Sequence, residues 1–191
     1  MQDGLFEIRW HGRGGQGAVT ASKILAEAAL AEGKFIQSFP EFGPERTGAP
    51  VRSYTRISSR PILIHSPIIH PDTVVLLDPS LLSTEDICQG LKPDGVILVN
   101  TKLTPVDIRK KLNLTGGRVF TVDATGIAIE KLGRNIPNTP VLGALVKITG
   151  LVQIETLINN FREKYSQKFA ANVIQGNLDA INKAASEVQK E

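Results

Sequence analysis

The sequence is poor in cysteine, since Cys88 is the only one among 191 residues. A single thiol closes no disulfide within the chain and cannot supply the four thiolate ligands of an iron–sulfur cluster. Any redox centre used with this protein would have to come from elsewhere. Aromatic residues are also scarce, at 5%, whereas 41% hydrophobic and 21% charged residues are typical of an ordinary globular protein.

Long apolar runs and one-sided charge are also missing. No run approaches the roughly 18 apolar residues that cross a bilayer, and residues 1–12 lack the pattern of a secretion signal, so we expect a cytoplasmic protein without a membrane anchor. The net charge of +3 argues against nucleic acid as a partner. Four of the ten arginines lie between residues 46 and 60, where they form either an anion- or partner-binding surface or a solvated face.

Short apolar runs alternate with helical patterns through the first two thirds of the chain. Strands are predicted at residues 6–10, 51–57, 73–78, 95–100 and 118–123, and helices at residues 18–32 and near 81–91, 104–112 and 125–133. The length fits one domain over residues 1–191. We therefore expect a three-layer, Rossmann-like α/β domain with a mostly parallel, mixed sheet.

Two further regions complete this prediction. Prolines and glycines between Phe39 and Pro50 predict a loop of constrained shape without regular structure. Beyond residue 136 the pattern is helical, with one helix capped by Thr139 and ended by Gly150, and a last helix from about Ser166. The C-terminal segment is therefore expected to be helical.

The most informative local motif is HGRGGQG at residues 11–17, between the first predicted strand and the first predicted helix. Gly12, Gly14 and Gly17 fit the spacing GxGxxG, and a helix N-terminus there offers N–H groups and a positive dipole end to a phosphate or pyrophosphate. The same glycines would also serve a purely structural role, by permitting a tight turn and close packing of helix on sheet. The spacing alone leaves both interpretations open.

The segment after the motif disfavours a dinucleotide-binding enzyme. NAD binding calls for a second apolar strand that ends in an acidic residue about 20 positions on, whereas Pro40 interrupts that segment and Glu41 opens a loop. The three histidines lack metal-ligand spacing and no nucleophile elbow is present, so we assign no catalytic residue and no metal ligand. His11 remains a candidate beside the glycines, with packing at a strand end as the simpler role, and Cys88 is expected to be an inert buried thiol in a helix.

Four segments, in order along the chain, carry a family resemblance: EIRWHGRGGQGAVTASKILAEAAL, FPEFGPERTGAPVRSYTRI, VDATGIA and IPNTPVLGALVKITG. Together they resemble the gamma subunits of the pyruvate:ferredoxin oxidoreductase (2-oxoacid:acceptor oxidoreductase) family, from about Phe6 to Gly150. The resemblance implies a subunit of an enzyme that reversibly decarboxylates pyruvate to acetyl-CoA and carbon dioxide and reduces ferredoxin. It also implies that this chain alone is inactive.

The same resemblance assigns the cofactors. It places thiamine diphosphate, Mg²⁺ and [4Fe–4S] clusters in partner chains, with alpha, beta and delta subunits as partners and this chain equivalent to the third catalytic domain. The chain would complete the active site and contact coenzyme A, through the N–H groups of residues 14–17 assisted by Arg13. The candidate cofactor-binding residues are Gly12, Arg13, Gly14, Gly15, Gln16, Gly17, Glu45, Arg46 and Thr47. Arg52 and Arg56 are further candidates for contact with a phosphate or carboxylate.

Three alternatives stay open at this point. The chain could serve another 2-oxoacid, namely 2-oxoisovalerate or 2-oxoglutarate. It could be a stand-alone Rossmann-like protein that binds NAD or flavin, or an assembly module whose glycines serve only packing. Nucleotide binding by the isolated chain would separate the last two from a subunit that binds coenzyme A: we expect no binding of NADH or FAD, and weak binding of coenzyme A that is lost on Gly14→Val.

Overall fold

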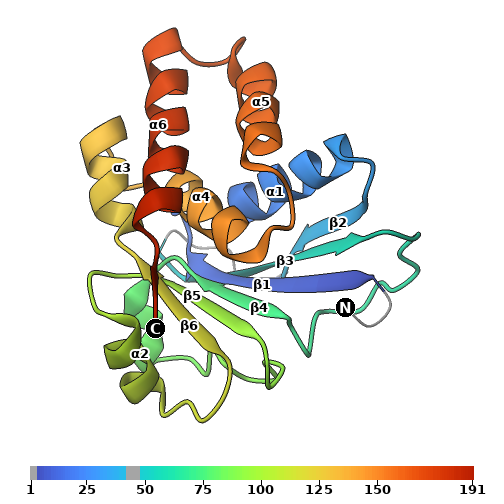
Figure 1. The fold of residues 1–191 in the computed structure, drawn as a ribbon, viewed down its shortest axis with the longest axis vertical. Helices are drawn as coiled ribbons and strands as arrows, with labels where there is room; N and C mark the ends of the chain where they lie inside the picture. The colour runs from blue at the N-terminus through green and yellow to red at the C-terminus, as the bar shows by residue number, and fades with distance from the viewer. Residues whose placement is uncertain (1–3, 42–47) are drawn as a thin grey trace.

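A mixed β-sheet runs through the molecule (Figure 1). The computed structural model describes residues 4–41 and 48–191, and within these residues seven strands form one sheet in the order β2-β3-β1-β4-β5-β6-β7. The strands are β1 (Leu5–Arg13), β2 (Phe35–Pro40), β3 (Pro50–Ser58), β4 (Thr73–Leu76), β5 (Val96–Asn100), β6 (Arg118–Val122) and β7 (Gln189–Lys190). Strands β1, β4, β5 and β6 are parallel neighbours, whereas β3 is antiparallel to β1 and β2, and β7 is antiparallel to β6. The predicted α/β class with a mixed sheet is confirmed.

Helices cover both faces of the sheet (Figure 1). One face carries α1 (Ala18–Ala31), α3 (Ala124–Leu132), α4 (Asn138–Thr149), α5 (Ile154–Tyr165) and α6 (Ala171–Glu187), and the other carries the 3₁₀ helix η1 (Pro79–Ser83) and α2 (Pro105–Leu112). Alternate residues of β4 feed the two cores: Val75 packs in the core with α1 and α4, and Val74 packs in the core with η1 and α2. Period-two alternation therefore fills two cores and gives the predicted three layers.

Helix α4 is the most enclosed helix of this arrangement. Every residue from Asn138 to Val146 is buried, so the helix has no solvent-facing stripe along that length. Gly143 faces α6 so closely that a Cβ atom built on it would lie 2.1 Å from the carbonyl oxygen of Ile181. The crossing of α4 and α6 thus depends on the absence of a side chain at this position.

Several predicted boundaries are confirmed and others are wrong. Helix α1 and the strands β3 to β6 lie at the predicted positions, and Gly150 ends α4 in the left-handed conformation with φ of 62°. The predicted helix at residues 81–91 is wrong, because only η1 forms there and Cys88 lies in a turn. Helix α6 begins at Ala171 and not near Ser166, since a separate α5 precedes it. Helix α4 begins at Asn138, one residue before the predicted cap.

Candidate functional site

The glycine motif is divided between a strand and a turn. Strand β1 continues through Arg13, so that His11 pairs with Arg52, Gly12 with Val51 and Arg13 with Pro50. The expectation that residues 11–17 form one loop is therefore wrong, and the turn before α1 consists of residues 14–17 alone. A Cβ atom at Gly12 would lie 3.4 Å from the Cβ atoms of Ala18 and Leu77, which makes this glycine a packing residue between strand and helix.

Part of the predicted set of backbone donors is already engaged within the chain. The Gly14 N–H donates to the Ala49 carbonyl (2.9 Å), and the Gln16 N–H donates to the Arg13 carbonyl (3.1 Å). Across the described residues, the N–H groups of Gly15 and Gly17 have no hydrogen-bond partner. Both glycines have positive φ, 97° and 82°, a conformation that side chains rarely adopt. Two of the four predicted amides therefore remain available to a ligand.

The β1–β4 clasp, formed by the side chains of Arg13, Gln16, Asp78 and Ser80, joins the glycine turn to the end of β4. Arg13 donates from Nε and Nη2 to Ser80 Oγ (3.0 and 2.9 Å) and from Nη1 to the Gly48 carbonyl (3.1 Å). Gln16 Nε2 donates to Asp78 Oδ2 (2.6 Å) while its Oε1 accepts from the Arg13 N–H (2.8 Å). Burial opposes ionisation of Asp78, but hydrogen bonds from Ser80 and Gln16 outweigh it and lower the pKa of Asp78. Arg13 and Gln16 are thus structural links.

The clasp occupies the place where open α/β sheets usually bind a nucleotide. After β1 the chain crosses to β2 on one side, and after β4 it crosses to β5 on the other, so the crevice between β1 and β4 is the topological switch point. Here the Gln16–Asp78 and Arg13–Ser80 hydrogen bonds close that crevice. A ligand would have to meet the exposed side of the turn, at Gly15.

Helix α4 supports the turn from the other side. A Cβ atom at Gly17 would lie 2.5 Å from Asn138 Nδ2, so the first residue of α4 touches the last residue of the turn. Asn138 Oδ1 accepts from the Thr139 N–H (2.8 Å), and Thr139 Oγ1 donates to Asn177 Oδ1 of α6 (2.9 Å). Two segments of the family resemblance, about 120 residues apart, thus form one structural unit. Sequence reasoning missed Asn138 as a neighbour of the turn.

His11 is buried and neutral. Its side chain is 1% exposed, Arg9 Nε donates to its Nε2 (3.0 Å), and its Nδ1 lies 3.4 Å from Glu85 Oε2. Burial and the charges of Arg9 and Arg52 lower the pKa of His11 to about 3. A group that stays unprotonated at neutral pH and is sealed from solvent suits packing and orientation better than proton transfer to a substrate.

The other candidate residues have different fates. Arg56 is 1% exposed and binds Glu7 Oε1 (2.7 Å) and Gln37 Oε1 (3.1 Å), so the expectation that it meets an external anion is wrong. Arg52 lies within ion-pair distance of Glu41 (3.8 Å) and Glu85 (3.3 Å). The predicted contacts of Glu45, Arg46 and Thr47 lie outside the described residues. Burial raises the pKa of Cys88 to about 11, which keeps the thiol protonated.

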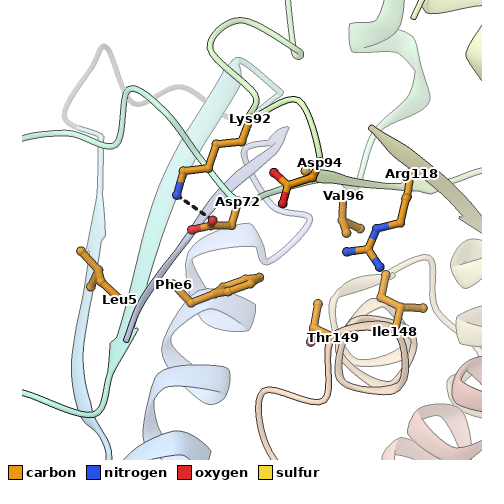
Figure 2. Close-up of a pocket in the computed structure, with 10 residues that line it drawn as sticks. Leu5, Phe6, Asp72, Lys92, Asp94, Val96, Arg118, Ile148 and Thr149 are labelled. Carbon is orange, nitrogen blue, oxygen red and sulfur yellow. Dashed lines mark hydrogen bonds and ion pairs between the residues drawn. The ribbon is translucent and has the colours of Figure 1, made fainter. Parts of the chain in front are cut away.

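A cavity lies at the opposite ends of the strands from the glycine turn. It encloses about 590 Å³ at the amino ends of β1, β4, β5 and β6, and Figure 2 shows Phe6 close to the Lys92–Asp72 ion pair, with Ile148 across the cavity beside Arg118 and Thr149. The pair spans 2.6 Å. No sequence pattern indicated this cavity, which shares no residue with the glycine turn.

Metal clusters and membrane spans are both absent from the described residues, 4–41 and 48–191. No group of three or more His, Cys, Asp or Glu side chains there is placed to hold a metal ion. None of the helices in that part of the chain combines the length and the apolar character of a membrane span.

Comparison with known proteins decides the family. Residues 7–187 match the family model described as pyruvate ferredoxin/flavodoxin oxidoreductase. The chain belongs to this family. The common subunit gamma of the pyruvate/ketoisovalerate oxidoreductases of Thermococcus kodakarensis is 50% identical over 179 residues, which cover 94% of this chain and 97% of the relative.

Further relatives agree in sequence and fold. Pyruvate synthase subunit PorC of Thermotoga maritima is 48% identical over 184 residues, which cover 96% of this chain and 95% of the relative. The crystal structure of the pyruvate oxidoreductase subunit PORC of the same organism superimposes with a TM-score of 0.87 at 45% identity, over 98% of this chain and 99% of that one. The resemblance of this chain to the gamma subunits of this oxidoreductase family is confirmed.

Proposed function

We propose that this chain is the gamma subunit of a pyruvate:ferredoxin oxidoreductase, in which pyruvate and coenzyme A give acetyl-CoA and carbon dioxide while ferredoxin is reduced. The observation that carries the proposal is identity at about half the residues, over nearly the whole length, with relatives named as such subunits. Alpha, beta and delta chains supply thiamine diphosphate, Mg²⁺ and the [4Fe–4S] clusters. This division agrees with the single cysteine of this chain, which cannot supply the ligands of such a cluster. We propose that the chain itself acts as one cytoplasmic domain.

A second 2-oxoacid is a specific alternative. The Thermococcus kodakarensis relative is named as a subunit common to pyruvate and ketoisovalerate oxidoreductases. A shared subunit cannot itself select one 2-oxoacid, so selection would lie in the chains that differ between the two enzymes. The same chain would then support both reactions when it is combined with either set of partners.

Coenzyme A is proposed to contact the outer side of the glycine turn. The N–H groups of Gly15 and Gly17 have no partner among the described residues, and a Cβ atom at Gly15 would meet nothing within 4 Å. The positive end of the α1 dipole adds to the attraction for one phosphate of coenzyme A. When bound, coenzyme A supplies the thiol that accepts the acyl group. The role of this chain is to hold the phosphate end.

Reconstitution tests the function. The chain purified alone is expected to decarboxylate no pyruvate, because its sequence shows no thiamine diphosphate motif and its single cysteine cannot ligate an iron–sulfur cluster to take up the electrons. Addition of alpha, beta and delta chains is expected to give ferredoxin reduction that depends on both pyruvate and coenzyme A. Activity of the isolated chain, or an assembled complex indifferent to its presence, would contradict the proposal.

A pair of glycine variants tests the coenzyme A contact. In the reconstituted complex, Gly15→Glu is expected to raise the KM for coenzyme A by about tenfold, because a carboxylate would repel the phosphate, with the KM for pyruvate unchanged. Gly33→Glu is the matched control, since Gly33 also has positive φ (76°) and open space, at the other end of α1. Equal effects of the two variants on coenzyme A would rule out the contact.

A further inference from the structure

The connection between β3 and β4 carries exposed aliphatic side chains. Because β1 lies between these two strands, residues 59–72 must cross β1 near its beginning. Within this connection, Leu63 is 84% exposed, Ile64 45% and Ile69 66%. These three residues form what we call the aliphatic ridge. Three such residues within seven positions exceed the scattered apolar residues of an ordinary surface.

A buried arginine fixes the first half of the ridge from below. Arg56 lies on the face of β3 away from α1, and its Nη2 donates to the Ser66 carbonyl (2.8 Å) while its Nη1 reaches the Ile64 carbonyl (3.4 Å). The Glu7 carboxylate holds the same guanidinium at 2.7 Å. Because two backbone carbonyls are bound to one buried cation, the backbone that carries the exposed side chains is held in place.

The second half is fixed by packing. Ile68 is only 3% exposed and anchors the segment in the protein. A Cβ atom at Gly90 would lie 2.1 Å from the Ile69 carbonyl oxygen, so the two backbones are in close contact. Prolines at positions 61, 67 and 71 further limit the segment. A ridge held in this way loses little entropy on binding, which favours its use as a contact surface.

The charge around the ridge defines what can cover it. Residues 59–71 include Arg60, His65 and His70 but no carboxylate. The first acidic residue after them, Asp72, is engaged by Lys92 Nζ (2.6 Å) and by the Glu7 N–H (2.8 Å). The complementary surface is therefore an apolar depression with acidic side chains at its rim.

We propose that the aliphatic ridge docks into such a depression on another chain of the oxidoreductase complex. The inference rests on the proposed function, because it takes this chain to be a subunit. A second copy of this chain fits less well, since a two-fold contact through the ridge would place Arg60 of both copies in one interface to which residues 59–71 contribute no carboxylate. The ridge lies on the side of the sheet away from α1 and is separate from the proposed contact with coenzyme A.

Substitution at the ridge tests the proposal in the reconstituted complex. Leu63→Asp is expected to weaken binding of this chain to the other chains by about 10- to 100-fold, because it removes apolar contact and places a carboxylate against an acidic rim. Leu30→Asp is the control, since Leu30 is also exposed (57%) but lies at the end of α1. Binding is measured by sedimentation or by competition with labelled wild-type chain, with thermal unfolding to show that both variants fold.

Arg60→Glu supplies a second variant at the same surface. It is expected to weaken binding less than Leu63→Asp and to flatten the salt dependence of the association, because a charge at the rim contributes mainly long-range attraction. A salt dependence equal to that of the wild type would contradict the acidic rim.

The possible outcomes distinguish failure of the proposed docking surface from failure of the proposed function. Normal binding by Leu63→Asp, or equal losses in Leu63→Asp and Leu30→Asp, would overturn the ridge and leave the proposed function intact. A wild-type chain that is dimeric alone and becomes monomeric on Leu63→Asp, with assembly of the complex unchanged, would assign the ridge to a second copy and also overturn the proposal. Failure of the wild-type chain to join the complex would contradict the proposed function itself.

Discussion

Replacement of Gly143 by alanine is expected to lower the free energy of unfolding by about 3 kcal/mol or more, as overpacking of a rigid contact can do. The added Cβ atom would lie 2.1 Å from the Ile181 carbonyl oxygen and 2.9 Å from the Ile181 Cα atom, which are backbone atoms of α6. No rotamer change relieves that contact, so α4 and α6 must separate. Chemical denaturation of the purified chain measures the loss.

The matched control is Gly133→Ala. Gly133 ends α3 with φ of 64°, and a Cβ atom there would meet no atom of residues 4–41 and 48–191 within 4 Å, so that backbone strain is what opposes the substitution. We expect a cost of about 1 kcal/mol. Similar losses in the two variants would show that the helices do not cross closely at Gly143.

The crossing also bears on the glycine turn. Helix α4 presents Asn138 to Gly17 at its first residue and Gly143 to α6 farther along the same helix. A shift of α4 away from α6 would therefore also change the position of Asn138 relative to the turn. The segment IPNTPVLGALVKITG therefore contributes both to the packing of α4 on α6 and to the support of the glycine turn.

Hydrophobic periodicity predicted most of the central sheet because both faces of it are covered. Strands β4, β5 and β6 read as apolar runs, and their alternate residues do enter two separate cores. The same signal failed at residues 81–91, where Leu81 and Ile87 pack on the sheet from η1 and a turn and not from a helix. Apolar residues that recur at short spacing indicate a buried segment, but a buried segment need not be a helix.

Strand β2 was missed because of Pro40. The residue ends β2, which lies at the edge of the sheet, so its lack of an N–H group interrupts no ladder between interior strands. Its neighbour β3 is antiparallel to both β1 and β2, an arrangement that a doubly wound dinucleotide-binding sheet does not have at this position. The topology therefore disfavours NAD binding, as the sequence does, although one strand was overlooked.

The site was predictable in its glycines and not in their partners. The motif GxGxxG located the turn, but Asp78 and Asn138, which hold it, are about 60 and 120 residues from Gln16 and Gly17, and no local pattern connects them. The arginines at residues 46–60 were expected to form either an anion- or partner-binding surface or a solvated face. Instead, registered pairs such as Glu7 with Arg56 form ion pairs beneath the connecting segments, which only the tertiary structure reveals.

Acidification is expected to destabilise the protein through His11. The folded chain holds the pKa of His11 at about 3, against an ordinary value of 6.5, so between these values the unfolded chain binds a proton that the folded chain excludes. The contribution of His11 to stability is therefore complete above the unfolded pKa and is lost as the pH falls toward the folded pKa. Each unit of pKa difference corresponds to about 1.4 kcal/mol, which makes the full effect several kcal/mol.

The geometry explains the direction of this effect. Arg9 Nε donates to His11 Nε2 at 3.0 Å, so protonation of that nitrogen would place two donors against each other beside a buried cation. Glu85 faces Nδ1 at 3.4 Å and favours the tautomer that carries its proton there. Arg52, which also lies 3.3 Å from Glu85, adds a second positive charge that opposes protonation. To free His11 from these contacts, β1 would have to separate from the segment that contains Glu85.

His11→Gln separates this mechanism from the general titration of carboxylates. The amide can accept from Arg9 and donate to Glu85 but cannot bind a proton, so the variant is expected to lose about 1–2 kcal/mol near pH 7 from imperfect packing. Its unfolding free energy should then fall less steeply than that of the wild type as the pH is lowered to about 4.5, by up to about 1.4 kcal/mol per pH unit. Denaturation curves collected across this range give both slopes. Parallel slopes would mean that His11 already titrates normally in the folded chain, and that the contact with Arg9 does not hold it neutral.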